Sequence, residues 1–130
     1  ASHIVFSAEA LHATAGESDD VAALRKLAQV TPALLGVTSG ARGVIWLDER
    51  GEPKQMPAFP VHTVDTLGAG DAFHGAFALG IAEGMALEQA MRFASATAAL
   101  KCTRLAGAFG SPQRIEVEEF LAARPASATI

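Results

Sequence analysis

The sequence predicts an α/β fold, in which short strands and amphipathic helices alternate along the chain. Residues 3–7 and 34–38 form short apolar runs, and the second is of the kind found in parallel strands buried on both faces. Between them, residues 21–29 carry apolar side chains on a single helical face. A helix that joins two such strands makes a βαβ unit, in which the two strands are parallel.

Local patterns place each further element. Pro32 prevents the first helix from continuing, and the turn at 49–52 sends the chain back after a strand at 44–48. This middle region is expected to be antiparallel and to lie at the edge of the parallel part. The other expected elements are, in chain order, a turn of helix at 9–12, a loop at 14–20, extended chain at 55–64, and helices at 72–82, 87–102 and 114–123.

Composition excludes several classes of protein. Hydrophobic residues make up 50% of the chain and charged residues 18%, which is typical of a globular domain. The formal net charge of -4 argues against a nucleic-acid partner. No apolar run approaches the ~20 residues that a membrane span needs. The single cysteine, Cys102, excludes an internal disulfide and fits a cytoplasmic protein.

A glycine-rich turn precedes the helix expected at 72–82. Gly68, Ala69 and Gly70 form a backbone with almost no side chain, and Asp71 follows directly. N–H groups at a helix start attract anions, and glycines let a phosphate approach within hydrogen-bonding distance. Asp71 could then take the proton of an attacking hydroxyl, as phosphoryl transfer requires. The alternative is a tight strand-to-helix turn in which Asp71 only caps the helix.

The string at 65–77, DTLGAGDAFHGAF, resembles the second signature of the ribokinase (PfkB) family of carbohydrate and nucleoside kinases. In that family the residue matching Asp71 is the catalytic base, and those matching 68–70 form the anion hole. The resemblance implies a Rossmann-like ribokinase fold, here the C-terminal part of a three-layer sandwich with a mostly parallel sheet and an antiparallel edge. Residues 1–124 would be the nucleotide-binding part of that domain, and 125–130 a frayed tail.

The segment at 38–43 would on its own be an ordinary turn. It also resembles the Thr-x-Gly-x-x-Gly loop that follows a strand in ribokinase-like enzymes and touches the phosphates and ribose of ATP. The resemblance assigns contacts with ATP to Thr38, Ser39, Gly40 and Gly43.

The resemblance extends into the last third of the chain. In the family, a helix matching 93–102 and the loop after it flank the adenine, and the candidates here are Ser95, Ala99 and Cys102. Many relatives also bind a monovalent cation such as K⁺ between an Asp and nearby carbonyls, and the candidates here are Asp65, Leu67 and Gly107. The stretch at 101–107 is more similar to ketohexokinase-like members than to ribokinase.

These resemblances imply an ATP-dependent kinase that phosphorylates a primary hydroxyl of a sugar, with Mg²⁺ bridging the phosphates. Family members are longer, with their sugar-site residues upstream, so the chain is expected to be a fragment that holds ATP at best and is inactive alone. Two alternatives stay open: a nucleoside or vitamin kinase of the same superfamily, and a non-catalytic α/β module that binds another anion. A homodimer also stays open.

The other polar residues are given structural roles. His74 is expected to pack or to form a hydrogen bond, and Arg42 to be a solvated loop residue. Glu17, Asp19 and Asp20 are expected to form a solvated loop with caps for the next helix.

Overall fold

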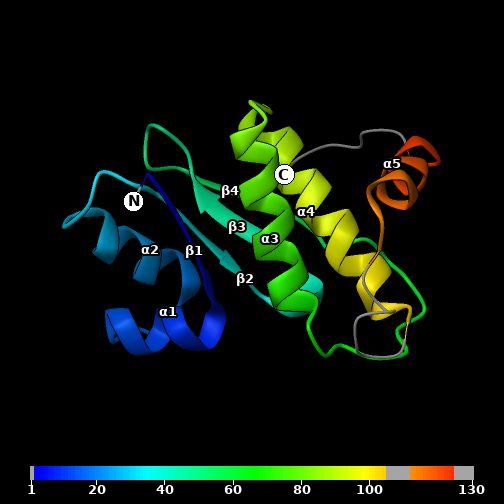
Figure 1. Ribbon diagram of the computed structural model, residues 1–130. Coiled ribbons are helices and arrows are strands. Elements are labelled where there is room, and N and C mark those ends of the chain that lie inside the picture. The colour runs from blue at the N-terminus through cyan, green and yellow to red at the C-terminus, as the bar shows by residue number, and fades with distance from the viewer. Residues whose placement is uncertain (1, 105–111, 125–130) are drawn as a thin grey trace. The chain divides into compact units, whose positions relative to one another are not determined.

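The computed structural model describes residues 2–104 and 112–124, and Figure 1 shows their helices and strands. The chain divides after Pro57 into two compact units. In the described residues, the first unit holds a four-stranded sheet and two α-helices, and the second holds three α-helices.

The sheet of the first unit has the strand order β1-β2-β3-β4. Its strands are β1 (His3–Ser7), β2 (Leu34–Thr38), β3 (Val44–Leu47) and β4 (Pro53–Met56). β1 and β2 run parallel, whereas β3 and β4 are antiparallel to their neighbours because short connections allow no other pairing. The antiparallel edge is confirmed. It makes up two of the three strand pairings in the described residues, so this part of the sheet is not mostly parallel.

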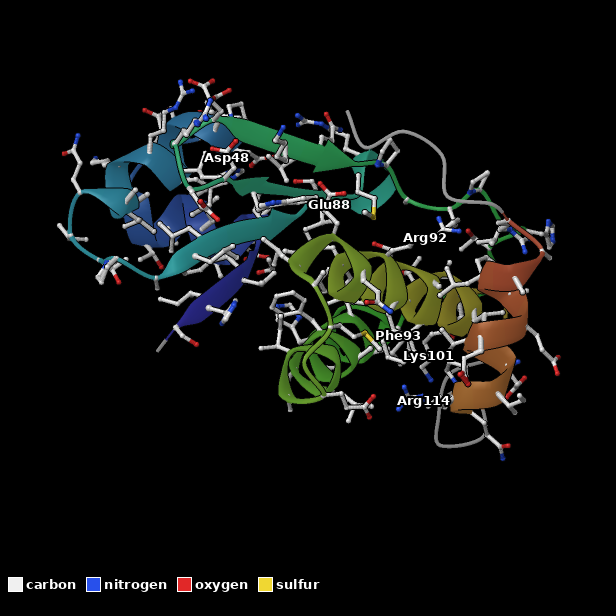
Figure 2. All side chains as sticks on the ribbon, turned by 90° about the horizontal axis from the view of Figure 1, so that it is seen from above. Asp48, Glu88, Arg92, Phe93, Lys101 and Arg114 are labelled. Atoms are coloured by element: carbon white, nitrogen blue, oxygen red, sulfur yellow. The ribbon has the colours of Figure 1, made fainter. Side chains whose placement is uncertain are left out.

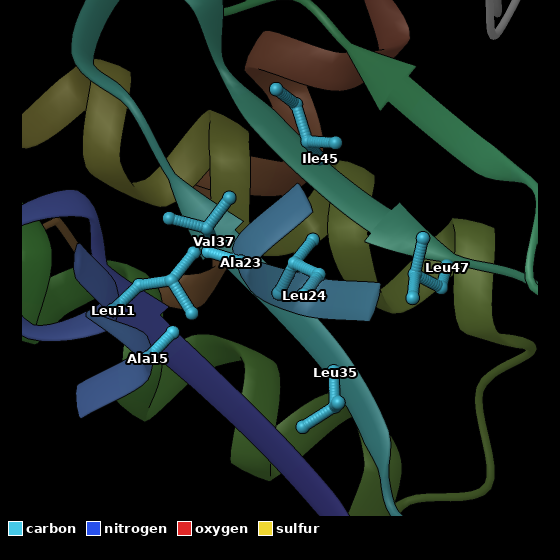
Figure 3. Packing of buried hydrophobic residues seen from close by; sticks show 8 residues of the cluster. All are labelled: Leu11, Ala15, Ala23, Leu24, Leu35, Val37, Ile45 and Leu47. Atoms are coloured by element: carbon cyan, nitrogen blue, oxygen red, sulfur yellow. The ribbon is translucent and has the colours of Figure 1, made fainter. Parts of the chain in front are cut away.

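Two helices pack on the sheet of the first unit. α1 (Ala8–Ala15) and α2 (Asp20–Ala28) begin after Ser7 and Asp19, whose side chains each accept a hydrogen bond from a backbone N–H of the first turn. Figure 3 shows that both helices contribute to one buried hydrophobic cluster with β2 and β3. Its members are Leu11, Ala15, Ala23, Leu24, Leu35, Val37, Ile45 and Leu47. Within each strand they alternate along the chain and so share one face of the sheet.

Most elements of the first unit match the sequence predictions. The βαβ unit is confirmed, and the turn of helix expected at 9–12 is the longer helix α1. Of the extended chain expected at 55–64, only the first two residues belong to a strand. Pro57 and Pro60 follow, and proline lacks the N–H that a strand ladder needs, which explains the early end of β4.

The second unit is built from α3 (Ala69–Ala82), α4 (Leu87–Cys102) and α5 (Arg114–Ala122). α3 and α4 lie side by side (Figure 1), and Gly80 allows their close approach. A Cβ at Gly80 would lie 3.2 Å from the Cβ of Ala90 and 3.0 Å from the Sδ of Met85. The helix expected at 87–102 is confirmed, and the one expected at 72–82 begins three residues earlier, at Ala69.

The last helix, α5, is attached to the rest of its unit by charged and aromatic contacts. The guanidinium of Arg104 pairs with the carboxylate of Glu116, which also accepts a hydrogen bond from the Gln113 N–H in a capping box. Phe120 meets the ring of Phe59 edge-on, with the ring centroids 5.2 Å apart. The predicted tail at 125–130 lies outside the described residues.

Candidate functional site

The glycine turn of the second unit is the start of α3. Gly68 is the N-cap, with φ 80° and ψ 0°, and its carbonyl accepts the N–H of Ala72 at 2.9 Å. Asp71 is therefore the third residue of the helix. Gly68 and not Asp71 is thus the N-cap, and an Asp71 that only stabilises the first turn stays the alternative to a catalytic base. Sequence reasoning placed the helix start too late because a Gly-Ala-Gly run has little helix propensity of its own.

The amides of the first turn of α3 have no partner inside the helix, as in any α-helix. Within the described residues, the N–H groups of Gly70 and Asp71 have no backbone acceptor. Both residues are exposed, and a Cβ added at Gly70 would meet no atom within 4 Å. The turn thus presents backbone donors and the carboxylate of Asp71 in the same open place, where the helix dipole favours an anion.

The turn is anchored to the end of α4. The carbonyl of Cys102 accepts the N–H groups of both Val64 and Asp65, at 2.7 and 3.1 Å. An oxygen of Asp65 in turn accepts the N–H of Leu67 at 2.8 Å. Burial raises the pKa of the Cys102 thiol, and the nearby charge of Asp65 raises it further. The thiol is therefore neutral near pH 7, which supports a structural rather than a reactive cysteine.

Lys101 is a cationic side chain beside this turn that sequence reasoning did not single out. It lies in the last turn of α4 (Figure 2) and is only 6% exposed. A Cβ added at Gly68 would lie 3.2 Å from the Cε of Lys101 and 3.9 Å from its Nζ. Its ammonium group adds positive potential where the first amides of α3 already favour an anion. In the sequence, the one feature that could have drawn attention to Lys101 is its position as a basic residue in the last turn of the helix expected at 87–102.

The structure brings together part of the predicted adenine and cation sites. Ser95 and Ala99 are buried and share a face of α4 with the half-buried Cys102, which contacts the turn as described. Gly107 lies outside the described residues. In the part of the chain that the structure describes, no three His, Cys, Asp or Glu side chains gather as they would around a metal ion. The cation site, which would rely on carbonyls, stays a prediction.

The first unit carries the other predicted loop, between β2 and β3. A turn of 3₁₀ helix at Gly40–Arg42 forms its tip, and the N–H of Ser39 donates to the carbonyl of Gly43 at 2.8 Å. Gly40 and Gly43 have φ of 52° and 83°, which a residue with a Cβ rarely adopts. The hydroxyl of Thr38 donates to the carbonyl of Phe6 at 3.4 Å. Ser39, Gly40 and Gly43 therefore lie in one closed loop, and Thr38 is the last residue of the strand before it.

Asp20, at the start of α2, is the second residue that sequence reasoning misjudged. It is only 6% exposed, so the predicted solvated position is wrong, although Asp19 does cap the helix. One oxygen of Asp20 accepts the Nε2–H of His12 at 2.6 Å, and the other accepts the hydroxyl of Ser39 at 2.8 Å. Burial raises the pKa of the Asp20 carboxyl, but these hydrogen bonds and nearby positive charges outweigh it and hold the pKa below its ordinary value.

No helix in the described ranges is long and apolar enough to cross a bilayer.

Three comparisons relate this chain to known proteins. The sequence model of a family described as pfkB family carbohydrate kinase matches residues 1–114. The ribokinase of Bacillus subtilis is 44% identical over 90 residues, which are 69% of this chain and 30% of that protein. The solved ribokinase of Thermotoga maritima is similar with a TM-score of 0.86 at 34% identity, over 93% of this chain and 42% of that chain. The structure of Arabidopsis thaliana ribokinase complexed with ribose and ATP has a TM-score of 0.79 at 26% identity, over 89% of this chain and 39% of that chain.

The likeness to these structures confirms the predicted α/β ribokinase fold. The chain spans 30% of the length of the Bacillus subtilis relative and about 40% of each solved chain. The family match covers the N-terminal part of this chain, and it does not confirm the prediction of a C-terminal portion.

Proposed function

This chain belongs to the pfkB family of carbohydrate kinases, and we propose that it supplies the nucleotide-binding part of an ATP-dependent sugar kinase. In this role the second unit holds the transferred phosphoryl group at residues 68–71, and the first unit contacts ATP through the loop at 38–43. The sugar is a small one such as ribose, which the Arabidopsis thaliana structure contains together with ATP.

The observation that carries the proposal is the open start of α3. Its exposed amides at Gly70 and Asp71 can donate to phosphoryl oxygens, and the buried ammonium of Lys101 lies beside the same turn. Donors that are fixed before the reaction stabilise charge as it develops, at no cost of reorganisation. A turn that only connected two elements would not need this combination of open amides, a carboxylate and a cation.

The chemistry assigned to this turn is in-line transfer of the γ-phosphoryl group. A primary hydroxyl of the sugar gives its proton to the carboxylate of Asp71 while its oxygen bonds to the γ-phosphorus, and the bond from that phosphorus to the β–γ bridging oxygen breaks. The products are the sugar phosphate and ADP. Mg²⁺, which accompanies ATP, supplies charge neutralisation on the phosphates. The amides of the turn hold the transferred group in line with the attacking oxygen.

Titration calorimetry of ATP with Mg²⁺ against this chain tests whether it binds the nucleotide. Gly70→Ala adds a methyl group to the turn that carries the amides and should weaken binding about tenfold, equal to about 1.4 kcal/mol. Gly75→Ala is the matched control, because it adds the same group to the same helix, also with no atom within 4 Å, but away from the amides. Equal binding by the two variants would contradict the proposed phosphate site.

A second experiment separates a kinase from a module that merely binds an anion. In a longer kinase that contains this chain, Asp71→Asn should lower kcat by several orders of magnitude and leave the affinity for ATP nearly unchanged. Near-normal turnover of that variant would remove Asp71 from the reaction. Comparing sugars with nucleosides as acceptors in the same assay decides between a sugar kinase and the alternative kinases of the superfamily.

A further inference from the structure

The loop at 38–43 is attached to α2 through one buried carboxylate, that of Asp20. Besides His12 and Ser39, Asp20 faces the guanidinium of Arg42, whose Nη1 lies 3.5 Å from the same oxygen that accepts the Ser39 hydroxyl. Asp20 therefore contacts the residue before the 3₁₀ turn and the residue that ends it. All four groups belong to the first unit.

These contacts give Ser39 a different role from the one that the resemblance assigns. Its hydroxyl donates to Asp20, and its N–H donates to the carbonyl of Gly43. Both donors of Ser39 are thus used to hold the loop closed. The side chain of Arg42, by contrast, is 66% exposed, and its Nη1 faces Asp20.

The geometry points to Asp20 as the positioning residue of the ATP loop, acting through Ser39 and Arg42 and itself oriented by His12. This inference rests on the proposed function, because it assumes that the loop contacts ATP. A loop with two glycines at positive φ loses much conformational freedom when it is ordered, and this loss costs free energy. The binding of a ligand must offset that cost unless contacts within the protein have already ordered the loop. The hydrogen bond from Ser39 to an ionised, buried carboxylate is of the stronger kind and orders the loop in advance.

Two measurements on the same variants test this role. Asp20→Asn and Ser39→Ala should speed hydrogen exchange of the amides at 39–43 and weaken binding of ATP with Mg²⁺ about tenfold, while circular dichroism stays that of the folded chain. Asp19→Ala is the control, because Asp19 caps the same helix but does not contact the loop. It should lower the Tm and leave loop exchange and the Kd for ATP unchanged.

If Asp20 acts through Ser39, the two changes are not additive, and the double variant binds ATP about as well as Asp20→Asn alone. Unchanged loop exchange in Asp20→Asn overturns the inference whatever the Kd. Faster exchange with an unchanged Kd also overturns it and leaves the proposed function standing. A wild-type chain that binds no ATP, even with a protected loop, overturns the proposed function and this inference with it.

Discussion

Gly68→Ala tests whether the turn before α3 needs a glycine. Gly68 has φ 80°, and this left-handed conformation costs a residue with a Cβ about 1–2 kcal/mol. The new Cβ would also lie 3.2 Å from the Cε of Lys101, but this is part of a flexible side chain that can shift by a few tenths of an ångström. Backbone strain is therefore the larger effect. We expect a loss of about 1–2 kcal/mol in the free energy of unfolding.

Urea denaturation followed by circular dichroism measures this loss. Gly70→Ala is the control, because Gly70 has no positive φ and its new methyl group meets no atom within 4 Å. It should be neutral or slightly stabilising, since alanine has the higher helix propensity. A cycle that combines Gly68→Ala with Lys101→Ala isolates the contact between the two residues.

Two results would refute the reasoning. If Gly68→Ala is as stable as Gly70→Ala, the left-handed conformation at the N-cap carries no cost and the turn has another shape. If the loss in Gly68→Ala disappears in the background of Lys101→Ala, the cost comes from the contact and not from the backbone.

Three further predictions concern packing and ionisation. Gly80→Ala should lower the free energy of unfolding by about 1–2 kcal/mol, because overpacking against the facing helix exceeds the gain in helix propensity. Gly75→Ala should raise the free energy of unfolding by about 0.5–1 kcal/mol, and urea denaturation of both variants measures the difference. The pKa of Asp20 is lowered in the folded state, so the ionised carboxylate stabilises the fold above its ordinary pKa of 3.8, and this effect is lost as the pH falls through the lower folded pKa. Asp20→Asn should therefore flatten the acid side of a curve of unfolding free energy against pH. The raised pKa of Cys102 predicts slower alkylation by iodoacetamide near pH 8 than for a small-molecule thiol. Asp65→Asn should speed this alkylation, and equal rates in the variant and the wild type would contradict an effect of the Asp65 charge on the thiol.

The local elements could be predicted from sequence because their signals are local. The apolar stripe of α4 spans four helical turns and is bounded by residues that fit its ends, so its limits at 87–102 were correct. β1 and β2 likewise followed from short apolar runs. The antiparallel arrangement of β3 and β4 could also be predicted, because the turn at 49–52 is too short to connect two parallel strands.

The roles of Asp20 and Lys101 could not be predicted because they depend on partners far along the chain. Asp20 is buried only because pairing of β1 with β2 brings Ser39 to the start of α2, 19 residues away in sequence. Without that partner, the run Ser18-Asp19-Asp20 leads one to expect exposed residues that cap the next helix. Lys101 in turn meets Gly68 only because α3 and α4 fold back on each other.

One carbonyl links two parts of the second unit that lie 37 and 38 residues apart in sequence, since the C=O of Cys102 accepts the N–H groups of both Asp65 and Val64. A displacement of the last turn of α4 must be transmitted to the segment that leads into α3. Substitutions that shift the backbone at position 102 should consequently also shift the segment before the glycine turn, so neither region can be altered independently of the other.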